Sequence, residues 1–388
     1  MQYLYGLCIL CLLWACRSGS AEQPILVDMH NDVLSGTVMQ GFDISHRLDT
    51  GNTDLVRLGE GGVDLQIFSA FGPQQYSGAR GFELINRQID SLYAIASRNP
   101  DKLEMAPTVK QALSIIGTGK MAGMIGVEGG HLIDGKLKYL DSLKKRGVVY
   151  LTLTWNNSTA WASSAVEESD PGYTGHKGLS DFGRRVVQRM NKLGMAVDLA
   201  HVGPKTFQDA LEVSTRPVLV SHGNARALCD VPRNLTDAQI RAVAESGGVI
   251  GVSFYAGFLD ENYTRRIQAA MEKQPLLLDS LRQLGYETQD RLMAAFLAEK
   301  PLLADSLKVP ITTLVDHIDH IVKIAGIDHV GLGGDYYGLT RIPFARGLED
   351  VRGYPILEKA LADRGYTTAD IRKIFGENVL RVLQEIQQ

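Results

Sequence analysis

The chain has 388 residues, and 40 lysines and arginines against 44 aspartates and glutamates leave a formal net charge of −4. Hydrophobic residues make up 45% and charged residues 22%, which is the composition of an ordinary globular protein. Without a basic excess, nucleic-acid binding has no electrostatic support. The 40 glycines and 13 prolines are scattered along the chain, which excludes collagen-like and low-complexity architectures.

The N-terminus has the pattern of a targeting leader. Residues 3–15 read YLYGLCILCLLWA, an apolar run shorter than the roughly 20 residues of a membrane span. The sequence Leu13-Trp14-Ala15-Cys16 resembles a bacterial lipobox, which implies cleavage before Cys16 and acylation of its thiol. We therefore expect a leader over residues 1–20 and a protein exported to the bacterial cell envelope, lipid-anchored at Cys16 or periplasmic. The alternative is a buried N-terminal strand or helix.

Cysteine usage agrees with this interpretation. Three of the four cysteines lie in the expected leader, so Cys229 stands alone in the rest of the chain. A single cysteine forms no internal disulfide, whatever the compartment.

Eight short apolar, β-rich runs recur after the leader, and most are followed by a helical pattern. Continuous apolar runs are typical of parallel strands that are buried on both faces. Eight such strands alternating with helices predict an α/β fold, a single (β/α)8 barrel spanning residues 21–388, with an open doubly wound sheet as the alternative. The predicted strands are 25–29, 63–71, 121–127, 148–154, 195–200, 217–221, 248–254 and 329–333.

Helix punctuation supports the alternation of strands and helices. Ser180 is placed to cap a helix that ends at Gly194, and capping boxes are expected at Thr236 and Thr367. The segment 260–308 breaks the pattern, because it predicts two or three amphipathic helices inserted before the last strand. It is interpreted either as a lid or side wall at the barrel mouth or as a peripheral decoration.

Polar side chains cluster where the predicted strands end. In a barrel these C-terminal strand ends face one mouth, which is where active sites of this fold lie. Imidazole and carboxylate groups are ligands of divalent cations, and one carboxylate can bridge two ions that lie roughly 3.5–4 Å apart. The pattern predicts a two-metal site, with the pair His30 and Asp32 on one ion, the pair His201 and His222 on the other, Glu128 between them, and Asp335 beside them.

The other six histidines carry weaker signals. His131 follows Glu128 closely and is interpreted either as a support for the ligands or as a loop residue. The remaining five are expected to be bystanders: His317 and His320 on a helix surface, His329 before its strand, and His46 and His176 in loops.

These motifs, in this order, resemble the membrane (renal-type) dipeptidases, zinc enzymes of the amidohydrolase-like barrel group. The resemblance runs from about residue 25 to the C-terminus, apart from the segment 260–308. The segments that carry it are VDMHNDVL, GVEGGH, GLSDFGRRVVQRMNKLGMAVDLAHVG, PVLVSHGNARAL, PRNLTD, GVSFYAGF, VDHIDHIVKIAGIDHVGLGGD and GENVLRVL.

The resemblance implies residue roles and cofactors. It makes the five predicted ligands the holders of two Zn²⁺ ions and implies attack on a dipeptide by a hydroxide that bridges them. Asp335 matches the aspartate that handles the catalytic proton, and Arg233 matches the arginine that binds the free carboxylate of the substrate. Tyr255, in GVSFYAGF, and Trp155 fall at substrate-binding positions. Family members are often dimers, so a homodimer is expected.

Two departures from the family pattern affect the substrate pocket. Trp155 stands after the strand LTLT, where the family commonly has a histidine that stabilises the oxyanion. Indole is a single donor, so this role is lost or moves to Asn156 or Asn157. Tyr337 replaces the second aspartate of the family motif GxDFDG. The alternatives are therefore a related hydrolase of N-acyl amino acids or other carboxylate-bearing substrates, or an envelope homologue without catalysis.

Overall fold

The computed structural model describes residues 24–286, 289–337 and 342–388, so the expected leader and Cys16 lie outside the described residues. Nine strands form one parallel sheet, and the pairing of β2 with β4 closes eight of them into a barrel, which confirms the predicted (β/α)8 fold and rules out an open sheet. The strands are β1 (Val27–Asn31), β2 (Leu65–Phe71), β3 (Leu103–Met105), β4 (Met121–Glu128), β5 (Val148–Thr152), β6 (Ala196–Asp198), β7 (Leu219–Gly223), β8 (Val249–Val252) and β9 (Val330–Leu332).

Strand β3 is the one that sequence patterns did not predict. It has three residues, pairs only with β4 and lies at the outer edge of the sheet. Only its first residue, Leu103, is buried, so it lacks the apolar run that marks the barrel strands.

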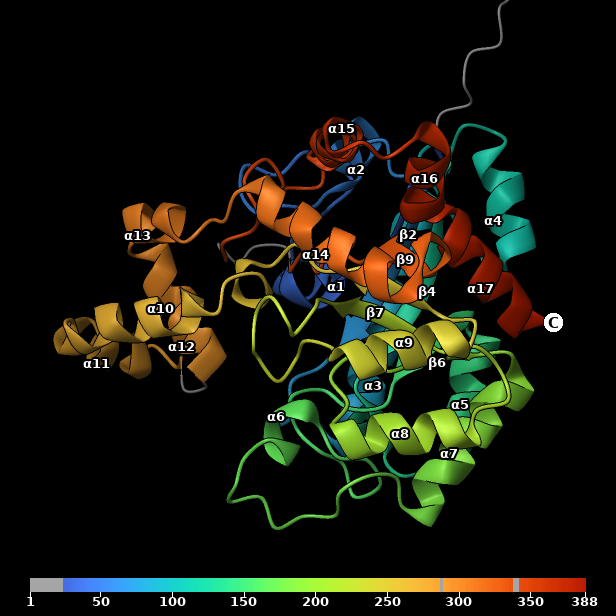
Figure 1. Cartoon of the computed structure of the whole chain (residues 1–388), viewed down its shortest axis with the longest axis horizontal. Helices are drawn as coiled ribbons and strands as arrows, with labels where there is room; N and C mark the ends of the chain where they lie inside the picture. Colours follow the sequence, from blue (N-terminus) through green and yellow to red (C-terminus); the bar gives the residue numbers. More distant parts are fainter. Residues whose placement is uncertain (1–23, 287–288, 338–341) are drawn as a thin grey trace, which may run out of the picture.

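The helices surround the barrel and connect its strands (Figure 1). Those before the last strand are α1 (Val33–Gly36), η1 (Val38–Gln40), α2 (Leu55–Glu60), α3 (Gly78–Arg98), α4 (Val109–Ile116), η2 (Gly130–Ile133), α5 (Leu137–Lys145), α6 (Ala165–Glu168), α7 (Asp181–Leu193), α8 (Pro204–Val213), α9 (Asp237–Glu245), η3 (Ala256–Phe258) and α14 (Ile311–Ala325). Those adjoining and following β9 are η4 (Ile327–His329), α15 (Tyr354–Arg364), α16 (Thr368–Arg372), η5 (Lys373–Glu377) and α17 (Asn378–Gln387). None of the described helices combines the length and the apolar character needed to cross a bilayer.

The predicted helix caps are confirmed. The Ser180 side chain accepts a hydrogen bond from the Gly183 amide, and Gly194 ends α7 in the left-handed region at φ 61°. Both capping boxes form, at Thr236 for α9 and at Thr367 for α16. Local hydrogen bonding alone is sufficient to define these helix ends.

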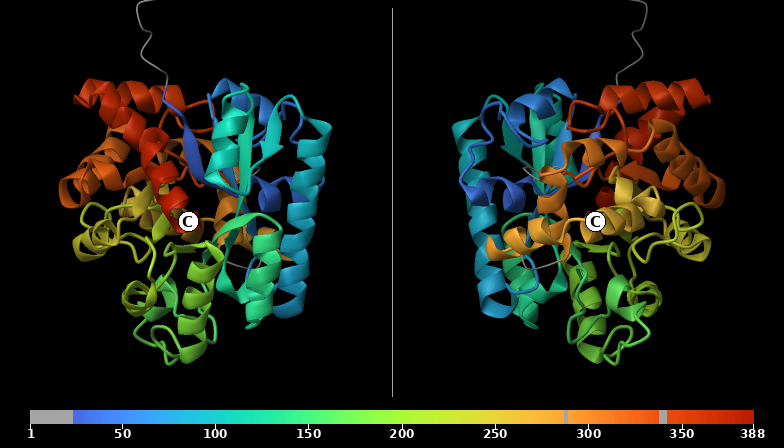
Figure 2. Two further views of the ribbon diagram at one scale, coloured as in Figure 1. Left: turned by 90° about the vertical axis from the view of Figure 1, so that its right-hand side faces the viewer. Right: turned by 90° about the vertical axis from the view of Figure 1, so that its left-hand side faces the viewer.

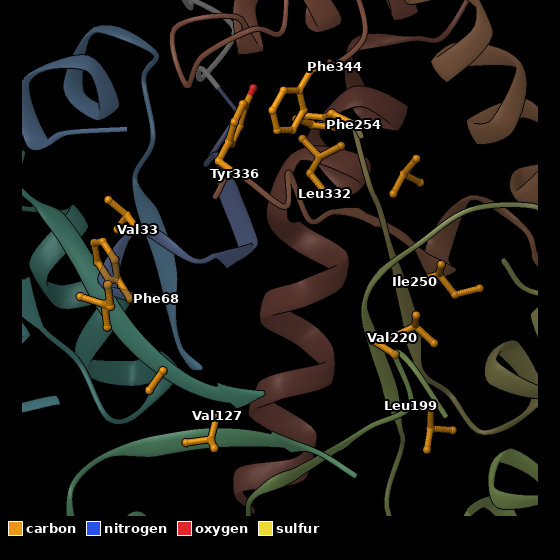
Figure 3. Packing of buried hydrophobic residues seen from close by; sticks show 14 of the residues in the cluster. Val33, Phe68, Val127, Leu199, Val220, Ile250, Phe254, Leu332, Tyr336 and Phe344 are labelled. Atoms are coloured by element: carbon orange, nitrogen blue, oxygen red, sulfur yellow. The ribbon is translucent and has the colours of Figure 1, made fainter. Parts of the chain in front are cut away.

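Helix α17 closes the end of the barrel opposite the predicted site. Its Val379, Val382 and Leu383 are buried in one apolar cluster with residues of β1, β2, β4, β5 and β8. Figure 2 (left) shows this side of the molecule with the C-terminus towards the viewer. A larger apolar cluster continues around the barrel, and Figure 3 shows members of it from β2, β4, β7 and β8.

The described residues of the inserted segment form four helices rather than the predicted two or three. They are α10 (Asn262–Glu272), α11 (Pro275–Gln283), α12 (Gln289–Ala298) and α13 (Pro301–Ser306). In Figure 1 they project from the barrel on the side opposite α17, and we call them the helical lobe. The prolines at 275 and 301 divide the segment, because each begins a new helix.

Candidate metal centre

The structure brings the predicted ligands together at the C-terminal ends of the barrel strands. His30 lies in β1 and His222 in β7, Glu128 is the last residue of β4, and Asp32, His201 and Asp335 follow β1, β6 and β9. All except the half-buried Asp335 are buried. Parallel strands have their carboxyl ends on one side, and this places side chains far apart in sequence in one cluster.

Glu128 lies at the centre of the cluster. Its Oε1 is 2.8 Å from His201 Nε2 and 3.7 Å from His222 Nε2. Its Oε2 is 3.8 Å from His30 Nε2, which in turn lies 3.5 Å from Asp32 Oδ2. The two oxygens of one carboxylate therefore face two different groups of histidines, as a bridging ligand requires.

Two sets of side chains could each hold a cation. The candidate ligand atoms of His30, Glu128 and His222 lie within 4.8 Å of one another, and so do those of His30, Asp32 and Asp335. In addition, the Nε2 atoms of His201 and His222 are 3.0 Å apart. His30 belongs to both sets. The two candidate cation sites therefore share a histidine, whereas the sequence predicted two separate pairs of ligands.

Hydrogen bonds at the opposite ring nitrogens orient all three imidazoles. His30 Nδ1 lies 2.8 Å from Tyr150 Oη, and that hydroxyl donates to the Met29 carbonyl. His201 Nδ1 lies 3.0 Å from Asn156 Oδ1. Each partner oxygen therefore accepts from Nδ1–H, which turns Nε2 of the imidazole into the cluster, where it can bind a cation once it is unprotonated.

The third imidazole is supported through a longer chain. His222 Nδ1 lies 3.0 Å from Ser221 Oγ, which donates to Asp198 Oδ2 at 2.7 Å. Asp198 also accepts from the Ser221 amide and from the Thr152 hydroxyl. Sequence reasoning did not identify Tyr150 or Asp198, although a tyrosine and an aspartate within apolar strands were a signal that could have found them.

The protonation states suit metal binding. Burial, together with the positive charges of Arg233 and His30, holds the pKa of both His201 and His222 well below the usual range, so these imidazoles are neutral. Burial and the neighbouring Asp32 carboxylate raise the pKa of Glu128. Burial works to lower the pKa of His30, but the carboxylates of Asp32 and Glu128 outweigh it and raise this pKa to about 10. A carboxylate-rich pocket of this kind favours a bound cation.

Two buried atoms in the cluster have no hydrogen-bond partner within the described residues. They are His30 Nε2 and Asp32 Oδ1. A buried polar atom without a partner costs about 1–3 kcal/mol, and coordination to a cation would remove that cost. The donor set of imidazole nitrogens and carboxylate oxygens therefore fits divalent cations such as zinc, manganese, cobalt or iron.

Backbone strain is concentrated at the cluster. His201 (φ 64°) and Asp335 (φ 61°) both adopt the left-handed region, which only one other non-glycine among the described residues, Asp134, shares. The Asp335 amide donates to the His30 carbonyl at 3.1 Å, which ties the ends of β9 and β1 together. Burial raises the pKa of the Asp335 carboxyl to about 7. A carboxyl near neutrality can take up and release protons at working pH.

Arg233 lies against the cluster in a buried position with 8% exposure. Its guanidinium donates to the His222 carbonyl at 3.3 Å and stacks over the Phe258 ring at 5.1 Å. Burial lowers its pKa to about 10, although the Asp335 and Glu128 carboxylates oppose that change. The group is charged at neutral pH and held by only a few contacts, so it can bind an anionic group at the mouth.

The predicted substrate-binding positions Trp155 and Tyr255 lie around this site. Trp155 is half-buried, with its ring 6.4 Å from that of His201 and 5.0 Å from that of Phe71. Tyr255 contacts the ring of Phe258, and therefore lies next to the residue that supports Arg233.

Tyr337 and Asn156 also lie close to the candidate metal ligands. Tyr337 is half-buried and follows Tyr336, whose carbonyl accepts from the Asp32 amide. Asn156, a proposed replacement for the missing oxyanion histidine, uses its side-chain oxygen to orient His201.

One prediction about the other histidines is wrong. His317 is fully buried on α14 rather than exposed, because its Nδ1 accepts from the Ala225 amide at 3.1 Å in the loop after β7. His131 contacts the Gly72 carbonyl at 2.8 Å and joins the segments after β2 and β4. His320 pairs with Asp237, His329 contacts the Gly248 carbonyl, and His46 and His176 are exposed.

A closed parallel barrel whose mouth gathers three oriented imidazoles and their carboxylates defines an amidohydrolase-like barrel protein with a candidate metal site. The family model described as membrane dipeptidase (peptidase family M19) matches residues 20–388. The chain belongs to this family, which confirms the resemblance seen in the sequence.

Relatives and solved structures agree with this assignment. Dipeptidase 3 of Mus musculus is 34% identical over 368 residues, which cover 94% of this chain and 64% of that protein; human Dipeptidase 3 is 32% identical, covering 94% and 65%. This chain thus spans just under two thirds of the length of these relatives. Among solved structures, PvdM of Pseudomonas aeruginosa, described as a probable dipeptidase, has a TM-score of 0.77 at 26% identity, covering 94% of this chain and 96% of that one. The M19 metallopeptidase named dipeptidase AC has a TM-score of 0.76 at 25% identity, covering 94% and 99%.

Proposed function

We propose that the protein is a dipeptidase that hydrolyses the peptide bond of dipeptides with two Zn²⁺ ions at the barrel mouth. The observation that carries the proposal is the convergence of three imidazole Nε2 atoms on one bridging-type carboxylate, Glu128, with Asp335 and Arg233 alongside. Family membership and the names of the relatives support the same reaction.

The residues that would hold the cations are those of the cluster. His30 and Asp32 would hold one ion and His201 and His222 the other, with Glu128 contributing an oxygen to each. Bound there, two divalent cations would polarise the substrate carbonyl and supply hydroxide near neutral pH.

The chain's own residues complete the chemistry. Asp335 takes the proton released from the attacking water and delivers it to the leaving amine, a role that suits a carboxyl with a pKa raised to about 7. Arg233 binds the C-terminal carboxylate of the substrate with a planar, bidentate fork. Holding a carboxylate at a fixed distance from the reacting carbonyl favours dipeptides over longer chains.

The test combines metal analysis of the purified protein with a hydrolysis panel of L-L, L-D and N-acylated substrates. We expect about two metal ions per chain and release of free amino acids from dipeptides. Asp335→Asn should lose most turnover and keep its metal, whereas Arg233→Met should mainly raise KM for substrates with a free carboxylate. Unchanged turnover in Asp335→Asn, or an equal effect of Arg233→Met on an amidated dipeptide, contradicts the assigned roles.

A second candidate is hydrolysis of N-acyl amino acids. Trp155 favours it, because an indole beside His201 makes this part of the mouth apolar, and Arg233 would bind either substrate through its carboxylate. Cleavage of acylated amino acids in preference to dipeptides in the same panel would select this activity. Trp155→His should then shift the preference towards dipeptides.

For localisation and assembly we propose an exported envelope protein that is acylated at Cys16 and forms a homodimer. The sequence pattern of residues 1–20 supports export and acylation, and the frequent dimerisation of family members supports the homodimer. Incorporation of radiolabelled palmitate into the wild-type chain and not into Cys16→Ala tests the anchor. Sedimentation equilibrium of the purified protein tests the dimer, and a monomer mass at micromolar concentration would contradict it.

A further inference from the structure

The helical lobe contains a duplicated sequence. Residues 275–282 read PLLLDSLR and residues 301–308 read PLLADSLK, identical at six of eight positions, and a Glu-Lys pair shortly precedes each proline. Each copy begins a helix after a preceding helix, α10 before α11 and α12 before α13. The lobe is therefore built from two helix–proline–helix units, and it lies outside the segments that carry the family resemblance.

The two proline turns lie side by side. Lys300 Nζ, just before the second proline, is 3.5 Å from Oε1 of Gln274, just before the first. Arg266 of α10 donates to the carbonyl of Ser306 at the end of α13 at 3.0 Å. Equivalent residues of the two units consequently share one region at the end of the lobe.

That region presents unusually exposed leucines. Leu276 and Leu302 hold equivalent positions directly after the two prolines and are 85% and 88% exposed. Leu284, at the other end of α11, is 72% exposed, whereas every other exposed large hydrophobic side chain of the described residues is below 50%. Apolar side chains displayed this fully at neighbouring positions indicate a surface that is covered by an apolar partner.

Basic side chains lie beside these leucines. Arg266, Lys273 and Lys300 line a cavity of about 400 Å³ together with Phe296 and Leu303, and none of its lining residues is acidic. Within the described part of the chain, no carboxylate forms an ion pair with any of the three cations. The cavity is therefore complementary to an anionic group that carries an apolar portion.

We propose that the end of the lobe docks on the surface of a phospholipid membrane. Phosphate head groups occupy the basic cavity, while Leu276 and Leu302 reach the boundary between head groups and acyl chains. Aliphatic and cationic side chains at one tip match the layered chemistry of a bilayer surface. A symmetric contact between two copies would instead gather the basic side chains of both copies in one interface, where like charges repel.

Vesicle co-sedimentation tests this with residues 24–388, which retain every described helix and strand and remove the leader as a source of membrane binding. Vesicles of phosphatidylglycerol and phosphatidylethanolamine are compared with pure phosphatidylcholine vesicles. Each basic residue at an anionic surface contributes about fivefold, so K273Q/K300Q should weaken binding to the anionic vesicles roughly 25-fold. L276Q/L302Q should weaken binding to both vesicle types by about tenfold or more.

Matched controls lie on α4, where Lys110 and Leu113 are exposed. K110Q/L113Q should bind vesicles like the wild type, and all variants should keep the wild-type thermal midpoint and hydrolytic activity.

Equal vesicle binding by the wild type and both lobe variants overturns the proposal. If soluble glycerol phosphate abolishes vesicle binding and the variant L276Q/L302Q still binds vesicles, the ligand is a free anion. A lower sedimentation mass of L276Q/L302Q without a change in vesicle binding would identify a dimer interface, and either result overturns membrane docking.

Discussion

The two ends of the barrel are both buried, but burial has opposite consequences there. At the closed end, Val379 and Leu383 of α17 pack against apolar strand residues and have no polar atom that needs a partner. At the mouth, His30, Asp32 and Glu128 are equally buried. The unpaired atoms His30 Nε2 and Asp32 Oδ1, together with the burial that raises the pKa of Glu128, oppose folding of the metal-free chain. The closed end therefore stabilises the fold, whereas the mouth contains buried polar groups that a bound cation would satisfy.

The largest expected effect is at Glu128. Glu128→Gln keeps the oxygen that faces His201 but removes the charge that would bridge two cations, so kcat/KM should fall by about 10³-fold and metal content should drop. The pKa of this carboxyl is raised, so its ionised form destabilises the folded chain at pH 7. The metal-free variant should therefore unfold at the same temperature as the metal-free wild type or higher. Calorimetry and metal analysis check both statements, and a lower midpoint in the metal-free variant would contradict the comparison.

The opposite change is expected at the closed end. Leu383→Ala leaves a cavity under the strands and should lower the free energy of unfolding by about 3 kcal/mol, while kcat/KM at 15 °C stays unchanged. Denaturant titration and steady-state assays measure the two quantities. Leu113→Ala, at an exposed position, is the control and should change stability by less than about 0.5 kcal/mol. Loss of activity in folded Leu383→Ala would show that the two ends are coupled.

Lowering the pH should decrease the free energy of unfolding through His317, which lies on the mouth side of the barrel. Burial lowers the pKa of this histidine from 6.5 to about 4, so the unfolded chain binds its proton first. Its contribution to stability is complete above pH 6.5 and is lost as the pH falls towards 4, by about 3 kcal/mol in total. His317→Gln keeps an acceptor for the Ala225 amide without titrating, so its stability should depend less on pH across this window. Denaturant titrations of both chains in metal-free form measure the difference, and parallel pH curves would refute the assignment.

The smallest effect is expected at Phe258, which stacks under Arg233. A cation–π contact contributes about 0.5–2 kcal/mol, so Phe258→Leu should raise KM roughly two- to thirtyfold for a dipeptide with a free carboxylate, at constant kcat. An amidated dipeptide should show no change, and Phe258→Tyr should retain the wild-type KM. An equal change in KM for both substrates would place Phe258 outside carboxylate binding.

Several features of the fold were predictable because they depend on local sequence. The barrel strands appear as apolar runs, and Ser180, Thr236 and Thr367 mark helix starts through hydrogen bonds within one turn. Convergence of the site residues followed from a single topological fact, since parallel strands place their carboxyl ends together. The short edge strand β3 lacked such a signal, whereas Pro275 and Pro301 were local signals for the additional helices of the lobe.

Other features depend on contacts between distant segments. Helical spacing places His317 on the buried face of α14 with Leu314 and Ile318, but its partner, the Ala225 amide, comes from a distant loop. The orientation of His30 depends on Tyr150, 120 residues away, and that of His222 depends on Asp198 through Ser221. No periodicity within a window of a few residues contains this information.

The sequence by itself determined the fold class, the helix caps and the identity of the residues at the strand ends, because hydrophobic periodicity and capping are local properties of the chain. Only the tertiary structure decided which nitrogen of each imidazole faces the cluster, which histidine is shared between the two candidate sets of ligands, and where the lobe displays its leucines. These depend on packing and hydrogen bonds between segments that meet only when the barrel closes.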